Sequence, residues 1–153
     1  MGKRSEKAVE LFNEGFNCSQ SVFTAFADYY GFDQETALKV SSSFGGGMGR
    51  MREVCGAVSG MFMVAGLETG TTEGKDVEGK KHNYDVVQQL AKEFKEKNHT
   101  IVCRELLGLD LKENTETRPE ARTKEYYQKR PCVEIVRECA EILEKYFEID
   151  VDN

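Results

Sequence analysis

The stretch that decides the expected fold is Cys55-Gly56-Ala57-Val58-Ser59-Gly60-Met61-Phe62-Met63-Val64-Ala65-Gly66-Leu67. Its only strongly polar residue is Ser59. A helix that is apolar all round is buried all round, so this segment is predicted to be the central helix. Gly56 and Gly60 lie one turn apart and let a neighbouring element approach closely. Tight packing is the interpretation we favour at these glycines, and access for a ligand is the alternative.

The segments on both sides carry the spacing and end signals of amphipathic helices. Asn17 and Asp33 are predicted N-caps, Gly31 is a predicted C-cap, and Pro131 suits the first position of the last helix. Helices are expected over residues 5–14, 17–30, 33–43, 76–97, 103–107 and 131–147, with a turn of helix near 120–127. The inward face predicted for 76–97 consists of Val77, Tyr84, Val87, Leu90, Ala91 and Phe94. Since no segment shows strand alternation, residues 1–153 are expected to form a single all-α domain, a bundle of about six helices.

Composition excludes several classes of protein. The 153 residues are 39% apolar and 31% charged, with a net charge of −6, which is typical of a globular chain and lacks the basic face of a nucleic-acid binder. The longest mostly apolar stretch, Val54 to Leu67, falls short of the roughly 20 residues that span a bilayer, so no membrane insertion is expected. No signal-peptide pattern precedes the first helix, and a cytoplasmic location is therefore predicted.

Four of the five cysteines fall in predicted first turns of helices: Cys18, Cys55, Cys103 and Cys132. A helix N-terminus carries unpaired N–H groups and about half a positive charge, and both favour the thiolate. The thiolate is the form that attacks, is oxidised or binds metal. Cys139 lies in mid-helix on an apolar stripe and is interpreted as a core residue. No CxxC pair exists, so any gathering of the thiols depends on the fold.

Glycines precede the central helix in Phe44-Gly45-Gly46-Gly47-Met48-Gly49. This stretch follows a predicted helix and lacks a Gly-Lys-Ser/Thr ending, so it matches no established phosphate-binding loop. We interpret it as a loop that shapes the approach to Cys55, and the candidate cofactor-binding positions are Gly45, Gly46, Gly47, Gly49 and Gly56. The two histidines, His82 and His99, are expected at the surface, although a ligand role for His99 stays open.

The run Cys55-Gly56-Ala57-Val58-Ser59-Gly60 matches a CGAxxG motif. Together with Asn17-Cys18, with Cys103-Arg104-Glu105-Leu106-Leu107-Gly108 and with the late Cys132, it resembles the C_GCAxxG_C_C family of redox-active proteins over nearly the whole chain. The resemblance implies that the four signature cysteines are Cys18, Cys55, Cys103 and Cys132 and that their role is redox chemistry. Similar sequence occurs in split-Soret cytochromes, but this chain lacks a haem-attachment motif, which removes the case for covalent haem.

Thiol/disulfide redox or electron transfer is the first hypothesis for these cysteines. Cys55 would be the most activated thiol, and Cys18, Cys103 or Cys132 would resolve it by disulfide exchange. No cofactor is needed for this chemistry, and its partner would be an unidentified redox protein or small molecule. A homodimer is also compatible with the sequence.

Two rival hypotheses remain open from the sequence. In one, Cys18, Cys55, Cys103 and Cys132 hold a metal ion or an iron–sulfur cluster, since four cysteine ligands suit either. In the other, the protein is a helical interaction module whose cysteines are incidental.

Overall fold

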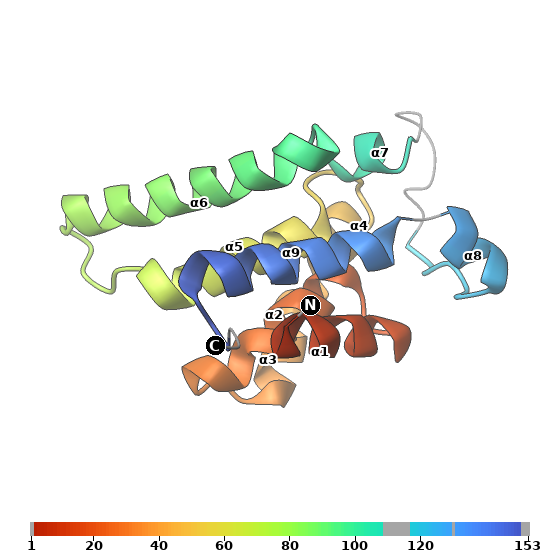
Figure 1. Ribbon diagram of the computed structural model, residues 1–153, viewed down its shortest axis with the longest axis horizontal. Helices are drawn as coiled ribbons and strands as arrows, with labels where there is room; N and C mark the ends of the chain where they lie inside the picture. Colours follow the sequence, from red (N-terminus) through yellow and green to blue (C-terminus); the bar gives the residue numbers. More distant parts are fainter. Residues whose placement is uncertain (1, 109–116, 130, 151–153) are drawn as a thin grey trace.

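A computed structural model of the chain describes residues 2–108, 117–129 and 131–150 (Figure 1). Its longer helices are α1 (Lys3–Asn13), α2 (Cys18–Ala27), α3 (Gln34–Ser42), α5 (Gly56–Thr69), α6 (Val77–Asn98) and α9 (Cys132–Phe147). Shorter turns are η1 (Asp28–Tyr30), α4 (Gly45–Met48), α7 (Cys103–Leu106) and α8 (Lys124–Lys129). The predicted all-α fold is confirmed.

The predicted caps explain where several of these helices begin and end. Asn17 and Gln20 form a reciprocal capping box at the start of α2, and the Asp33 carboxylate accepts a hydrogen bond from the Thr36 amide at the start of α3. Gly31 ends η1 with a φ of 73°, as a C-cap glycine does. One detail differs from the prediction, because Pro131 is the N-cap of α9 and the helix itself begins one residue later.

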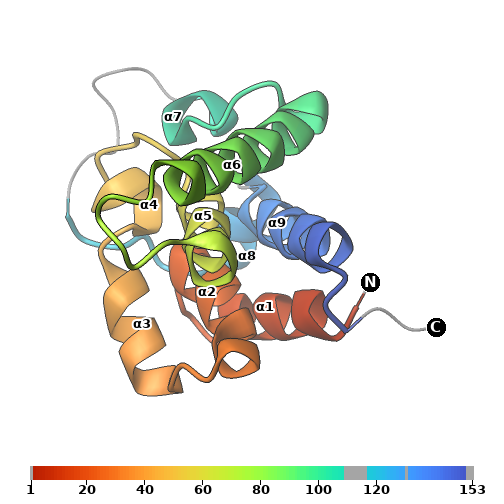
Figure 2. The same cartoon turned by 90° about the vertical axis from the view of Figure 1, so that its left-hand side faces the viewer.

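Helix α5 is central, as predicted, and α2, α6 and α9 pack around it (Figure 2). An added Cβ at Gly60 would lie 2.9 Å from the Ser19 carbonyl oxygen and 3.1 Å from the Cβ of Val22. The missing side chain therefore lets α2 lie directly on α5, which confirms the packing interpretation for this glycine. Burial covers Gly56 to Met61 on all sides, whereas Gly66 and Leu67 near the end of the helix are exposed.

The inward face predicted for α6 is partly wrong. Val86, Leu90 and Phe94 form its buried stripe, whereas Val77 is 70% exposed and Tyr84 is 62% exposed. At about 100° per residue, Val77 and Tyr84 lie roughly 160–180° around the helix from Val86. Over the 17 residues from Val77 to Phe94 the helix turns through about 1,700°, so the first and last members of the predicted set lie about 100° apart around the helix.

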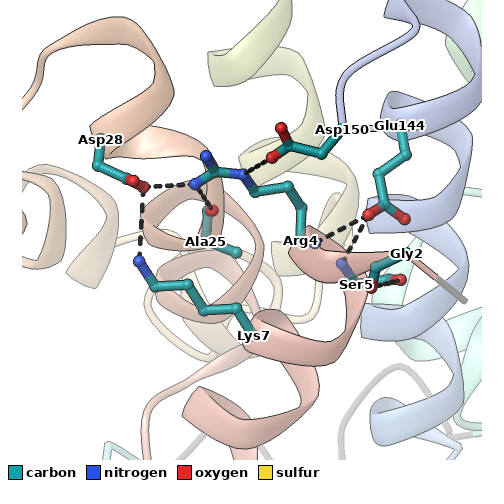
Figure 3. A network of polar contacts seen from close by, with 8 residues as sticks. All are labelled: Gly2, Arg4, Ser5, Lys7, Ala25, Asp28, Glu144 and Asp150. Atoms are coloured by element: carbon teal, nitrogen blue, oxygen red, sulfur yellow. Dashed lines mark hydrogen bonds and ion pairs between the residues drawn. The ribbon is translucent and has the colours of Figure 1, made fainter. Parts of the chain in front are cut away.

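The two ends of the chain are joined by a polar network (Figure 3). The buried Glu144 carboxylate accepts hydrogen bonds from the amides of Arg4 at 2.8 Å and Ser5 at 3.2 Å, and so caps the start of α1. The Arg4 guanidinium donates to Asp28 at 2.5 Å and to Asp150 at 2.6 Å. These contacts attach α1 to both α9 and the end of α2.

At one end of the bundle, on the right in Figure 1, α4, α7 and α8 lie near the beginning of α9. This end carries the features described below. Among the described residues, no helix is both long enough and apolar enough to cross a membrane.

Candidate functional site

The four cysteines expected at helix starts are found there. Cys18, Cys103 and Cys132 are the first residues of α2, α7 and α9, and Cys55 is the N-cap of α5. All four line one cavity of about 470 Å³, so the fold gathers sulfur atoms from distant parts of the chain. The glycines named from the sequence line the same cavity, namely Gly45, Gly46, Gly47, Gly49 and Gly56.

Cys55 and Cys103 are held together by their backbones. The amide of Cys55 donates to the Ile101 carbonyl at 2.7 Å, and the amide of Cys103 donates to the Glu53 carbonyl at 2.6 Å. These bonds flank an isolated antiparallel bridge between Val54 and Val102. Residues on either side of such a bridge point to the same face, so both thiols are directed to one side.

The glycine-rich stretch is a left-handed turn and not an ordinary loop. Residues 46–50 all have φ between 57° and 72°, and Met48 and Arg50 are among them. For a residue other than glycine this conformation costs about 1–2 kcal/mol. The turn is closed by the amides of Arg52 and Glu53, which donate to the carbonyls of Gly46 and Gly47 at 3.2 and 2.9 Å.

Two glycines bring backbone against the cysteines. An added Cβ at Gly47 would lie 2.6 Å from the Cβ of Cys103, and one at Gly56 would lie 3.3 Å from the Cβ of Cys18 and 3.0 Å from the Phe44 carbonyl oxygen. A side chain at either position would therefore separate the elements that carry the thiols. The glycine-rich turn packs against Cys103, which the sequence did not indicate.

The side chains of Cys18 and Tyr126 each form a hydrogen bond with the side chain of Cys132. The bond to Cys132, followed by burial, raises the pKa of Cys18 well above its ordinary value. Burial and then the sulfurs of Cys132 and Cys18 raise the pKa of Tyr126. Both side chains keep their protons, and at Cys132 the N-terminus of the 16-residue α9 favours negative charge.

The environment of Cys55 disfavours its thiolate. Burial raises the pKa of its thiol to about 12, although the amides of Val58 and Ala57 act to lower it. This raised pKa runs against the expectation that Cys55 is the most activated thiol. Its side chain is removed from water at the centre of the bundle, and this desolvation outweighs the helix N-terminus.

Cys103 has a cationic neighbour. The Nη1 atom of Arg52 lies 3.7 Å from the Cys103 sulfur, and both residues are buried. Arg52 lies three positions before Cys55 in the sequence, and the structure directs its guanidinium to a cysteine 51 residues later. A positive charge at this distance favours the thiolate of Cys103.

One wall of the cavity comes from a segment that the sequence left largely unassigned. The residues of this segment that line the cavity are Thr117, Pro119, Glu120, Arg122 and Tyr126. The Arg122 guanidinium lies 4.0 Å from the centroid of the Phe12 ring and donates to the carbonyls of Phe12 and Phe16 near the end of α1. Tyr126 was missed because no motif marks a tyrosine as the partner of a cysteine six positions later.

Cys139 lies in the core, as predicted, with no exposed surface. Burial raises its pKa well above the ordinary value, and so does the nearby sulfur of Cys55. His82 and His99 are exposed, also as predicted.

In the described part of the chain, none of the five cysteines forms a disulfide. Within residues 2–108, 117–129 and 131–150, no group of three or more His, Cys, Asp or Glu side chains is arranged to hold a metal ion.

Comparison with known proteins gives one family. No curated protein and no solved structure matches the chain. Residues 16–146 match the family described as "Putative redox-active protein (C_GCAxxG_C_C)", and the matched range includes all four cavity cysteines. Because this match covers most of the chain, the protein belongs to the C_GCAxxG_C_C family of redox-active proteins.

Proposed function

We propose that the protein is a thiol–disulfide redox protein in which Cys132 is the attacking sulfur and Cys18 resolves it. The observation that carries this proposal is that Cys18, Tyr126 and Cys132 line one cavity, where the side chains of Cys18 and Tyr126 interact with that of Cys132. Stabilisation of a thiolate by donors and by a helix N-terminus is what thiol exchange requires of an attacking cysteine.

The reaction proceeds in two steps. The Cys132 thiolate attacks one sulfur of a partner disulfide, a mixed disulfide forms, and the first partner thiolate leaves. The sulfur of Cys18 then attacks Cys132, the Cys18–Cys132 disulfide forms, and the second partner thiolate leaves. The two protons of the protein thiols pass to the partner, which is reduced by two electrons. Such a dithiol must begin reduced, which suits a cytoplasmic location.

Cys55 and Cys103 form a second pair in this proposal. Their backbones are joined around the bridge, and the thiols share the cavity with the first pair. The Arg52 guanidinium stabilises Cys103 as an attacking or leaving thiolate. The second pair would pass electrons to the first by further exchange, which leaves Cys139 outside the cycle.

Peptide mapping after mild oxidation tests the assignment. Reduced protein is treated with one equivalent of diamide, remaining thiols are alkylated, and cross-linked peptides are identified by mass spectrometry. We expect a Cys18–Cys132 disulfide that dithiothreitol reverses, that is lost in Cys132→Ser, and that persists in Cys139→Ala. Absence of any reversible disulfide between cavity cysteines would overturn the proposed function.

A further inference from the structure

The cavity is the route by which a substrate reaches the thiols. Cys55 is 6% exposed and Cys103 is 7% exposed, while Cys18 and Cys132 are half-buried along the cavity lining. Residues 117–126 supply a wall that Arg122 holds against α1. Sulfurs placed in this way are more accessible to a small disulfide that enters the cavity than to a disulfide held on the surface of a folded protein. The volume of about 470 Å³ lies in the range of roughly 300–1,000 Å³ typical of small-molecule pockets.

Among the described residues, the cavity lining holds more basic than acidic side chains. The described residues that line the cavity include three arginines, Arg50, Arg52 and Arg122, and one glutamate, Glu120. The chain as a whole carries a net charge of −6. A positively charged cleft with low-dielectric walls concentrates small anions and accelerates their capture.

The left-handed turn positions two of these cations. The Arg50 side chain runs over Gly46, where an added Cβ would lie 2.7 Å from the Arg50 Cγ. Arg52 follows at a φ of 61° and directs its guanidinium to Cys103. Strained residues of this kind persist where the surrounding structure holds them in place, and they cluster at ligand sites.

We infer that the substrate is a low-molecular-weight disulfide carrying carboxylate groups, bound in the cavity beside Arg50 and Arg52. This inference rests on the proposed thiol–disulfide function and adds the chemical class of the oxidant. One substrate S–S bond breaks and one protein S–S bond forms. Two protein thiols are oxidised, and two anionic small thiols leave with the two protons and two electrons.

Three small disulfides that differ in charge test the inference. Glutathione disulfide is anionic, bis(2-hydroxyethyl) disulfide is neutral, and cystamine is cationic. For each disulfide, the rate of oxidation of the reduced protein is divided by the rate at which the same disulfide reacts with 2-mercaptoethanol at the same pH. This normalisation removes differences in the intrinsic reactivity of the three disulfides. We expect the normalised rate of glutathione disulfide to exceed that of cystamine by about tenfold or more, and the ratio to fall as salt is added.

Variants locate the preference in the cavity. Arg50→Gln should reduce the ratio several-fold, and Arg50→Lys should retain most of it because the charge is kept. Lys39→Gln is the control, since it removes one exposed positive charge from α3, outside the lining. All variants are compared only after their thermal unfolding shows that they are folded.

The outcomes separate the two claims. A Cys18–Cys132 disulfide that forms with all three reagents at equal normalised rates overturns the substrate class and leaves the redox function standing. A preference that Arg50→Gln does not alter also overturns the inference. If none of the reagents produces a disulfide between cavity cysteines, the proposed function itself fails.

Discussion

Arg122 donates a hydrogen bond from Nη1 to the carbonyl oxygen of Phe12 at 2.6 Å, across 110 residues of sequence. A second bond reaches the carbonyl of Phe16 at 2.8 Å. The guanidinium thus satisfies backbone acceptors near the end of α1 while its own segment forms a wall of the cysteine cavity. One side chain therefore links the end of α1 to a wall of the cavity.

Arg122→Ala is expected to destabilise the protein and to open the cavity. Hydrogen bonds to a charged donor contribute about 1.5–3 kcal/mol, so a loss of about 2 kcal/mol in the free energy of unfolding is predicted. Urea denaturation measures this loss, and alkylation of Cys18 and Cys132 should become faster. Arg118→Ala is the matched control, because Arg118 is exposed four residues earlier in the same wall segment. Equal effects of the two substitutions would contradict the role of Arg122.

Tyr126→Phe is expected to slow the reaction of Cys132 with iodoacetamide by about tenfold at pH 7.5. The change removes one hydrogen-bond donor to the sulfur, and each 1.4 kcal/mol of lost thiolate stabilisation is a factor of ten in thiolate population. Site-specific alkylation followed by mass spectrometry provides the rate. Tyr146→Phe, an exposed hydroxyl on α9, serves as the control. Indistinguishable rates in wild type and Tyr126→Phe would remove Tyr126 from the site.

Stability should fall in alkaline solution because buried thiols keep their protons in the folded state. Burial raises the pKa of Cys139 well above its ordinary value, and the unfolded chain ionises near pH 8.5. The stabilising contribution is fully present below pH 8.5 and is lost as the pH rises toward the folded pKa. Each such thiol contributes a slope of about 1.4 kcal/mol per pH unit.

Cys139→Ala isolates this contribution. The free energy of unfolding of reduced protein is measured in urea at several pH values from 8 to 11, for wild type and variant. The wild-type curve should fall more steeply, by about 1.4 kcal/mol per pH unit. Parallel curves would show that Cys139 ionises alike in the folded and unfolded chains.

Gly60→Ala and Gly66→Ala, on the same helix, should have opposite effects on stability. A Cβ at Gly60 meets the Ser19 carbonyl oxygen at 2.9 Å, so α2 must move and about 1–3 kcal/mol of stability is lost. Gly66 has nothing within 4 Å of an added Cβ, and alanine there should stabilise the helix by up to about 1 kcal/mol. Thermal unfolding of the two variants measures the contrast. A stable Gly60→Ala protein would refute the close crossing.

Much of the fold could be predicted because its signals are local. Asn17 and Asp33 accept hydrogen bonds from amides three residues ahead, so a helix start can be read within one turn of sequence. The apolar run that begins at Cys55 indicated the central helix for the same reason. Prediction failed along α6, where the choice of the Val86 face over the Tyr84 face depends on how α5 and α9 pack against the helix.

The amino-acid sequence by itself determined the helices, their caps and the position of four cysteines at helix starts, because each depends on contacts within a few residues. Tertiary structure alone decided that those cysteines share a cavity, that Tyr126 and Cys18 form hydrogen bonds with Cys132, and that Arg52 faces Cys103. The same packing buries Cys55 and raises the pKa of its thiol. Burial of Cys55 destabilises its thiolate by more than the helix N-terminus stabilises it. The extent of burial is set only when distant segments of the chain come together.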